Sequence, residues 1–280
     1  MTEAIALDLR AWWEGVVATT RIQFRYPSQT IGWLVWPVIL PVTYVLQARA
    51  FSGGSPAAAA AFMQRTGTAS VVGFLFVGFA VYMWISNVLW GPGTQLRQLQ
   101  QIGALEAMYL TPANRAALLF APSGGFLVQA VLMMVVVGGF LRFVFAVELT
   151  PPEVLKAVGV VALSVFPMYG MGAAFSVLVL VFKEPNGMVQ FLRGLFQVTC
   201  GITFPIVVLP GWVQGVALAL PPTHILSAVR GVLLGGAGLA RVRGDLLALA
   251  IAGALLCWLG VVAYDAAERY ARRTGGLGQY

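Results

Sequence analysis

The sequence predicts an all-α polytopic membrane protein with six transmembrane helices, and three observations lead to this fold class. Hydrophobic residues make up 59% of the 280 residues and charged residues only 10%, whereas soluble domains carry about 25% charged residues. The mean hydropathy is +0.85. Six stretches contain no Asp, Glu, Lys or Arg, and a bilayer core needs roughly 20 apolar residues per helix. These are residues 26–48, 66–96, 116–141, 157–182, 194–229 and 246–264, with 23, 31, 26, 26, 36 and 19 residues.

The first element expected is an amphipathic helix within residues 1–28 that lies in the membrane interface. At 100° per residue its apolar side chains gather within about 100° of arc, and its charged side chains occupy a separate sector. The apolar set is Leu9, Trp13, Val16, Val17, Thr20 and Phe24, and the charged set is Arg10, Glu14, Arg21 and Arg25. Pro27 and Ser28 then turn the chain into the first span, 30–48, in which Pro37 and Pro41 predict a kink.

Four more spans follow before the pattern changes, at residues 68–90, 116–140, 154–181 and 187–209. The run Thr150-Pro151-Pro152-Glu153 has the spacing of a capping box with proline in the first turn, and it opens the fourth span. Lys183-Glu184-Pro185-Asn186 makes a tight polar turn into the fifth span.

Residues 210–236 are apolar but broken into two pieces, each too short to cross a bilayer. Pro221 and Pro222 separate Gly211–Leu220 from Thr223–Leu234. Broken helices of this kind re-enter the membrane from one side or lie in it, protected by protein. We therefore predict an extracytoplasmic re-entrant hairpin here, followed by the last span at 246–264.

The arginines set the expected orientation. Arg21 and Arg25 precede the first span and three arginines follow the last, so both termini are expected in the cytoplasm. Two ends on one side require an even number of crossings, which favours six spans plus a hairpin over seven spans. The whole chain, 1–280, is then a single transmembrane domain of a multi-pass protein of the cell (inner or plasma) membrane, bound to the lipid bilayer and not to nucleic acid.

A polar, helix-forming stretch at residues 92–112 interrupts this apolar pattern, and the orientation places it in the cytoplasm. It carries an apolar row, Leu96, Leu99, Ile102, Leu105 and Tyr109, beside the polar residues Arg97, Gln100, Gln101 and Glu106. Thr111 and Pro112 end it. From the pattern alone, such a helix either lies on the lipid surface or docks into a groove of a partner protein.

Two segments resemble the permease subunit of type-2 ATP-binding-cassette (ABC) exporters of the daunorubicin-resistance-like family. The first is Gly103-Ala104-Leu105-Glu106-Ala107-Met108-Tyr109-Leu110-Thr111-Pro112, which is similar to that family's Gly-x-Leu-Glu-x-x-x-x-Thr/Ser-Pro segment. The second runs from Pro221 and Pro222 through His224 to Arg230-Gly231, and it is similar to a Pro-to-Arg-Gly segment of the same family. The order of spans, polar helix and broken hairpin also resembles that family.

This resemblance implies that residues 92–112 are a coupling helix, seated in a cleft of a separate ABC ATPase subunit. The expected coupling residues are Leu99, Ile102, Leu105, Glu106, Tyr109 and Thr111. The resemblance also implies two ATPase copies and a second permease chain, as a homodimer or a heterodimer. The substrate would be an amphiphilic drug, a lipid or a lipid-linked saccharide.

The residues themselves agree that any ATPase is another polypeptide. Neither Lys156 nor Lys183 lies in the Gly-Lys-Ser/Thr of a phosphate-binding loop. We therefore expect a non-catalytic subunit that binds no cofactor or metal, with ATP and Mg in the partner chain.

Other functional classes depend on a few ionisable residues. An intramembrane protease would need a nucleophile and a base in the bilayer, and the single histidine, His224, is interpreted as a polar residue at a helix start. An ion-coupled secondary transporter would need ionisable residues within its spans, and Arg193 is the clearest of these. Arg193 either reaches the cytoplasmic interface, which the sequence favours, or lines the pathway or a subunit contact. A channel is a further alternative.

Overall fold

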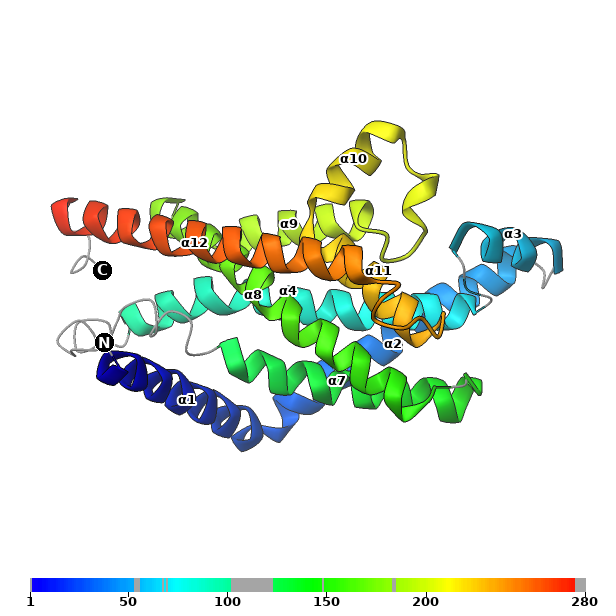
Figure 1. Ribbon diagram of the computed structural model, residues 1–280, viewed down its shortest axis with the longest axis horizontal. Helices are drawn as coiled ribbons and strands as arrows, with labels where there is room; N and C mark the ends of the chain where they lie inside the picture. Colours follow the sequence, from blue (N-terminus) through cyan, green and yellow to red (C-terminus); the bar gives the residue numbers. More distant parts are fainter. Residues whose placement is uncertain are drawn as a thin grey trace.

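The computed structural model describes residues 2–52, 56–66, 68, 70–101, 123–147, 149–182 and 185–274. Within these ranges the chain is helical apart from short connections, and no strand occurs. In the described part of the chain five helices are long and apolar enough to cross a membrane, and a bent pair of shorter helices, Gly211–Ala219 and Pro221–Leu233, could form a sixth span. The five are α2 (Pro27–Ser52), α4 (Val71–Gln101), α7 (Ser123–Phe145), α8 (Pro151–Phe182) and α12 (Arg243–Thr274), which lie side by side along the bundle (Figure 1).

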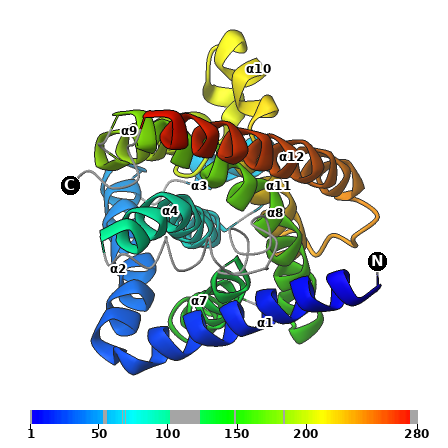
Figure 2. The same cartoon turned by 90° about the vertical axis from the view of Figure 1, so that its left-hand side faces the viewer.

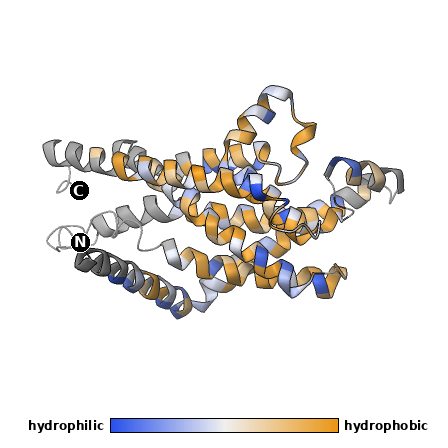
Figure 3. Cartoon of the chain, in the orientation of Figure 1, coloured by the Kyte–Doolittle hydropathy of each residue, from blue (hydrophilic) through white to orange (hydrophobic). Residues whose placement is uncertain are grey.

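The outside of this bundle is apolar, as expected for a membrane protein (Figure 3). On α12, for example, Ile251, Leu255 and Trp258 are all more than half exposed and fall on one face at helical spacing. Soluble proteins rarely expose apolar surface of this extent. The long apolar helices and their apolar exterior together identify a transmembrane protein.

The N-terminal helix and a short helix after the first span lie at opposite ends of the bundle (Figure 1). α1 (Thr2–Arg25) is a single helix, as predicted, and its Val16 is buried while Trp13 is 59% exposed. The sequence analysis did not anticipate α3 (Pro56–Thr66). Five consecutive alanines and a proline at its first position favour that helix.

The core of the protein is α4, which packs against α2, α7, α8, α9 and α11 (Figure 2). Its large side chains, including Phe76, Phe79 and Trp84, are almost completely buried. The indole N–H of Trp84 donates to the carbonyl of Phe126 on α7, 3.0 Å away. α4 also continues without a break past its apolar part to Gln101, where the description of this segment ends.

The tightest helix crossing joins α8 and α12, and small residues make it possible. A Cβ atom on Gly170 would lie 2.6 Å from the backbone N of Cys257, and one on Gly260 would lie 3.0 Å from the carbonyl oxygen of Gly170. The thiol of Cys257 donates to the carbonyl of Phe166 at 3.2 Å. Close backbone approach through small residues is the usual way that membrane helices associate.

The start of α8 confirms part of the predicted capping box. The backbone N–H of Thr150 donates to Glu153 Oε2 at 2.9 Å. In a capping box the glutamate at the third helical position accepts from the N-cap residue in this way. The other half differs, because the backbone carbonyl of Thr150 accepts from the N–H of Glu153 at 3.1 Å.

The expected fifth span, 187–209, differs most from the structure. α9 (Pro185–Thr199) has 15 residues and ends ten residues early. Gly201 takes a left-handed conformation with φ +77°, which glycine adopts without strain. The chain then runs irregularly through a short 3₁₀ helix, Ile206–Val208. At 1.5 Å per residue α9 is about 22 Å long, shorter than a hydrocarbon core of about 30 Å.

The broken apolar segment forms two helices, as its proline pair predicts. α10 (Gly211–Ala219) and α11 (Pro221–Leu233) meet at 87°. α10 projects from the side of the bundle beside α9 and α12, whereas α11 packs on α4, α8 and α12 (Figures 1 and 2). α1 begins, α4 ends and α12 ends at the same end of the bundle, on the left in Figure 1.

Candidate functional site

Most of the predicted coupling residues lie outside the described residues. Ile102, Leu105, Glu106, Tyr109 and Thr111 all belong to the undescribed part 102–122, and Leu99 is described only as backbone of α4. The described part of the stretch, up to Gln101, is helical, and it is the direct continuation of α4. The coupling helix itself stays a prediction.

In the described part of the bundle, arginine, histidine and aspartate side chains make contacts between helices in three places, and the first is a line along α9. Gln190, Arg193 and Gln197 are spaced i, i+3 and i+7, so at 100° per residue they fall within about 60° of arc. The neighbouring face of α9 is apolar and buried, with Val189, Leu192 and Phe196 at its centre. We call Gln190, Arg193 and Gln197 the polar line.

The polar line contacts α4 through the phenol of Tyr82. The hydroxyl of Tyr82 donates to Gln197 Oε1 at 3.5 Å, and the Cζ atom of Arg193 lies 5.7 Å from the centroid of the Tyr82 ring. Arg193 Nη1 donates to Gln190 Oε1 at 3.2 Å, while its buried Nε has no partner within the described part of the chain. The guanidinium is therefore held between α9 and α4, where the described residues give it an amide and an aromatic ring as partners.

The second place is the break after α9, where Arg230 of α11 binds freed backbone carbonyls. Arg230 Nη1 donates to the carbonyl of Gly201 at 2.6 Å, and Nη2 donates to those of Ile202 at 2.7 Å and Phe74 at 3.0 Å. Its Cζ lies 3.4 Å from the centroid of the Phe74 ring. In lipid a broken helix needs such internal donors, because no water is present to satisfy its carbonyls.

Gly78 of α4 makes this clamp possible. A Cβ atom at Gly78 would collide with both Arg230 Nη2 and the carbonyl oxygen of Ile202. The absence of a side chain lets the broken backbone lie directly on α4. Arg230, Gly78 and Gly201 come from three separate regions of the sequence, and together they hold the break closed.

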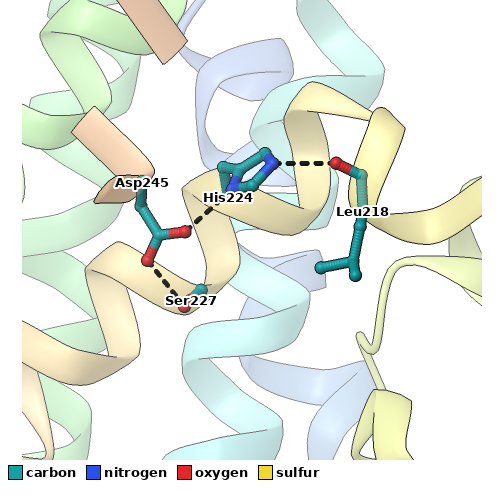
Figure 4. Close-up of polar contacts among 4 residues, drawn as sticks. All are labelled: Leu218, His224, Ser227 and Asp245. Carbon is teal, nitrogen blue, oxygen red and sulfur yellow. Dashed lines mark hydrogen bonds and ion pairs between the residues drawn. The ribbon is translucent and has the colours of Figure 1, made fainter. Parts of the chain in front are cut away.

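The third place joins α10, α11 and α12 (Figure 4). His224 Nδ1 lies 2.8 Å from Asp245 Oδ1, and Nε2 lies 2.9 Å from the carbonyl oxygen of Leu218. Ser227 Oγ donates to Asp245 Oδ2 at 2.8 Å. Both ring nitrogens face acceptors, so a singly protonated ring satisfies one of them and a doubly protonated ring satisfies both. Asp245 therefore ties α11 to the start of α12.

This third cluster has the residue types of a hydrolytic triad but another geometry. A nucleophilic serine must hydrogen-bond to the histidine that takes its proton. Here Ser227 bonds to Asp245, and the remaining nitrogen of His224 faces a backbone carbonyl. The arrangement suits a structural tie between helices. Across the described residues, no three His, Cys, Asp or Glu side chains are grouped closely enough to hold a metal ion.

Comparison of the chain with family models finds no match, and comparison with curated proteins finds none either. The resemblance to type-2 ABC permeases therefore rests on the two quoted segments and on the order of the elements.

Among the residues singled out from the sequence, Arg193, His224 and Arg230 all make side-chain contacts between helices. Pro221 and Pro222 are buried at the start of α11, where proline is favoured at the first helical positions. The sequence analysis missed Gln190, Gln197 and Asp245. The spacing of the two glutamines around Arg193 was a signal that could have revealed the polar line, because it gives α9 one polar face.

Proposed function

We propose that this chain is the membrane-spanning permease subunit of an ATP-driven ABC exporter that moves an amphiphilic substrate out of the cytoplasm. The observation that supports the proposal best is the course of α4. This helix is the buried centre of the bundle, and it continues past its apolar part to Gln101. The next residues are the segment that resembles a coupling helix, so a rigid rod joins that segment to the core.

The proposed topology has six crossings with both termini in the cytoplasm. The five candidate spans would be completed by α9 together with the irregular chain after it, and α10 and α11 would form the extracytoplasmic re-entrant hairpin. The common end of α1, α4 and α12 is then the cytoplasmic end (Figure 1). This crossing would be a broken one, because α9 alone is too short to span the hydrocarbon core as a helix and the irregular chain after it would complete the passage.

In the proposed assembly two permease chains face each other above two copies of an ABC ATPase. ATP and Mg²⁺ would bind to the ATPase, and closure of the two ATPase copies would push on residues 92–112. α4 would carry that push along its axis to the two arginine contacts that it makes, at Tyr82 with Arg193 and at Phe74 with Arg230.

Copurification from the native host in mild detergent, followed by mass spectrometry, tests the proposal. We expect an ABC ATPase with the wild-type chain, and its loss with Leu99→Asp or Glu106→Gln. Removing one partner of a buried interfacial charge pair costs about 2–5 kcal/mol, enough to separate the subunits without unfolding the spans. Gln100→Asp is the matched control, because it adds the same carboxylate on the polar side of the same helix. Unchanged copurification with both test variants would refute the coupling assignment.

A further inference from the structure

In the proposed topology the polar line on α9 lies within the membrane. Gln190, Arg193 and Gln197 are about 7 to 18 Å along the helix from its first residue, at 1.5 Å per residue. Ionisable side chains at such depth face the protein interior or a water-filled cavity, and they mark substrate or ion pathways. Gln190 is nevertheless exposed, and Arg193 and Gln197 are only partly covered.

Open space lies beside this line on the same helix. A Cβ atom on Gly187 or Gly194 would meet no atom within 4 Å. Beyond the two glycines stand Phe191, which is 70% exposed, and Val198. The surface thus has a polar side against α4, a floor without side chains, and an apolar ridge. This arrangement suits an amphiphile, whose headgroup would lie at the polar line and whose acyl chain would lie along Phe191 and Val198.

Among the described residues no carboxylate is shown paired with the positive charge of Arg193. Its guanidinium contacts Gln190 and the Tyr82 ring, and the ion pair shown there joins His224 and Asp245. Arg193 Nε has no hydrogen-bond partner among the described residues, as is also true of Arg230 Nε, so the guanidinium of Arg193 keeps unused donors. Arg is the side chain that binds phosphate and carboxylate with several parallel donors.

We propose that the polar line binds the phosphate group of an anionic amphiphile, which makes phosphate-bearing lipids and lipid-linked molecules the substrate class. This inference rests on the proposed export function and selects one class among the amphiphilic substrates that this function allows. A cationic drug would be repelled by Arg193, whereas a phosphate can accept from its free N–H groups and from the amides of Gln190 and Gln197. In the proposed topology the start of α9 faces the cytoplasm, and Gln190, the first residue of the line, lies about 7 Å along the helix from that end.

Binding to the purified full chain in neutral detergent tests the inference. The probes are a short-chain phosphatidic acid, the phosphatidylcholine and the quaternary ammonium amphiphile of the same chain length, and inorganic phosphate. We expect tightest binding of phosphatidic acid by the wild type. Arg193→Gln should weaken it about ten- to a hundredfold, the range for losing a hydrogen bond to a charged group. Arg193→Lys should weaken it less, since the charge remains but the planar fork is lost.

Two further variants separate the site from general effects of charge. Gly194→Leu fills the open space without touching Arg193, and it should weaken phosphatidic acid binding while thermal stability is unchanged. Arg241→Gln removes an exposed arginine from the connection between α11 and α12 and should bind as the wild type does. If inorganic phosphate binds tightly to the wild type and Arg193→Gln abolishes this binding, the ligand of the site is a free anion and not a lipid headgroup.

The inference is overturned if Arg193→Gln binds phosphatidic acid as the wild type does, or if the ammonium amphiphile binds equally well. Copurification of the ATPase is measured on the same preparations. Its absence with intact selective binding would refute the export function alone, whereas its presence with unselective binding would refute the substrate class alone.

Discussion

Replacing Arg230 with methionine should open the break that follows α9, and the size of the effect can be worked out from its hydrogen bonds. The carbonyls of Gly201 and Ile202 accept from Arg230 at 2.6 and 2.7 Å, and both residues are buried. A buried acceptor left without its partner costs about 1–3 kcal/mol, so two cost about 2–6 kcal/mol. Methionine avoids the desolvation of a guanidinium, which offsets part of this cost. We therefore expect the lower end, about 2 kcal/mol.

A buried thiol next to the break reports this opening. Cys200 directly precedes Gly201 and is 0% exposed, so its reaction with a thiol reagent requires local opening. The assay uses a Cys257→Ala background, in which Cys200 is the single thiol. A change of about 2 kcal/mol corresponds to roughly thirtyfold faster labelling. Labelling of the Arg230→Met variant at the wild-type rate would refute the role given to the guanidinium.

A second variant opens the break from the other side and keeps the arginine. Gly78→Ala places a Cβ atom against Arg230 Nη2 and the Ile202 carbonyl, so it should also accelerate the labelling of Cys200. Gly139→Ala on α7 is the matched control, because a Cβ there meets nothing within 4 Å. Equal labelling rates in the two alanine variants would show that the backbone at the break does not rest on α4.

Three other predictions concern topology, packing and the tie between α11 and α12. In a background without the native cysteines, an impermeant thiol reagent should label Gln100→Cys only from the cytoplasmic side and Leu239→Cys only from outside. Labelling of both cysteines from the same side would refute six crossings. Gly170→Leu should lower the thermal unfolding temperature or prevent folding, since overpacking costs about 1–3 kcal/mol or more and a Cβ there already meets the α12 backbone. Ser227→Ala should destabilise the protein by up to about 1.5–3 kcal/mol, the range for one hydrogen bond to a charged group. Asp245→Asn should cost more, because Asp245 contacts both His224 and Ser227; equal losses in denaturation in micelles would contradict the central position of the carboxylate.

Five of the six predicted spans correspond to long apolar helices, because lipid tolerates few charges, but the length of an apolar run does not show where a helix ends. α12 therefore begins at Arg243 and continues to Thr274, ten residues beyond the predicted span. α4 likewise passes Trp90 and stays helical to Gln101. A helix that leaves the bilayer keeps its backbone hydrogen bonds in water, so its ends depend on caps and breakers and not on charge.

The end of α9 could not be read from local signals. Residues 194–229 form the longest charge-free run, so composition gives no reason for a helix to stop within it. Gly201 permits the left-handed turn, yet an isolated glycine is also common inside membrane helices. What stabilises the break is a donor 29 residues further on, because Arg230 binds the carbonyl of Gly201. That contact depends on the packing of α11 against α4, which a single sequence does not reveal.

The composition of the sequence draws attention to the two arginines that flank this run, but it does not predict their contacts. Arg193 and Arg230 mark its ends, although Arg193 lies inside the predicted fifth span, 187–209, and Arg230 inside the predicted hairpin, 210–236. In the structure both reach α4, where Arg193 lies over Tyr82 and Arg230 over Phe74. The two rings are eight residues apart, about 12 Å along one helix. Any axial shift of α4 would therefore change both contacts together. A movement of this helix would act on the break after α9 and on the polar line at the same time, although the two are separate in sequence.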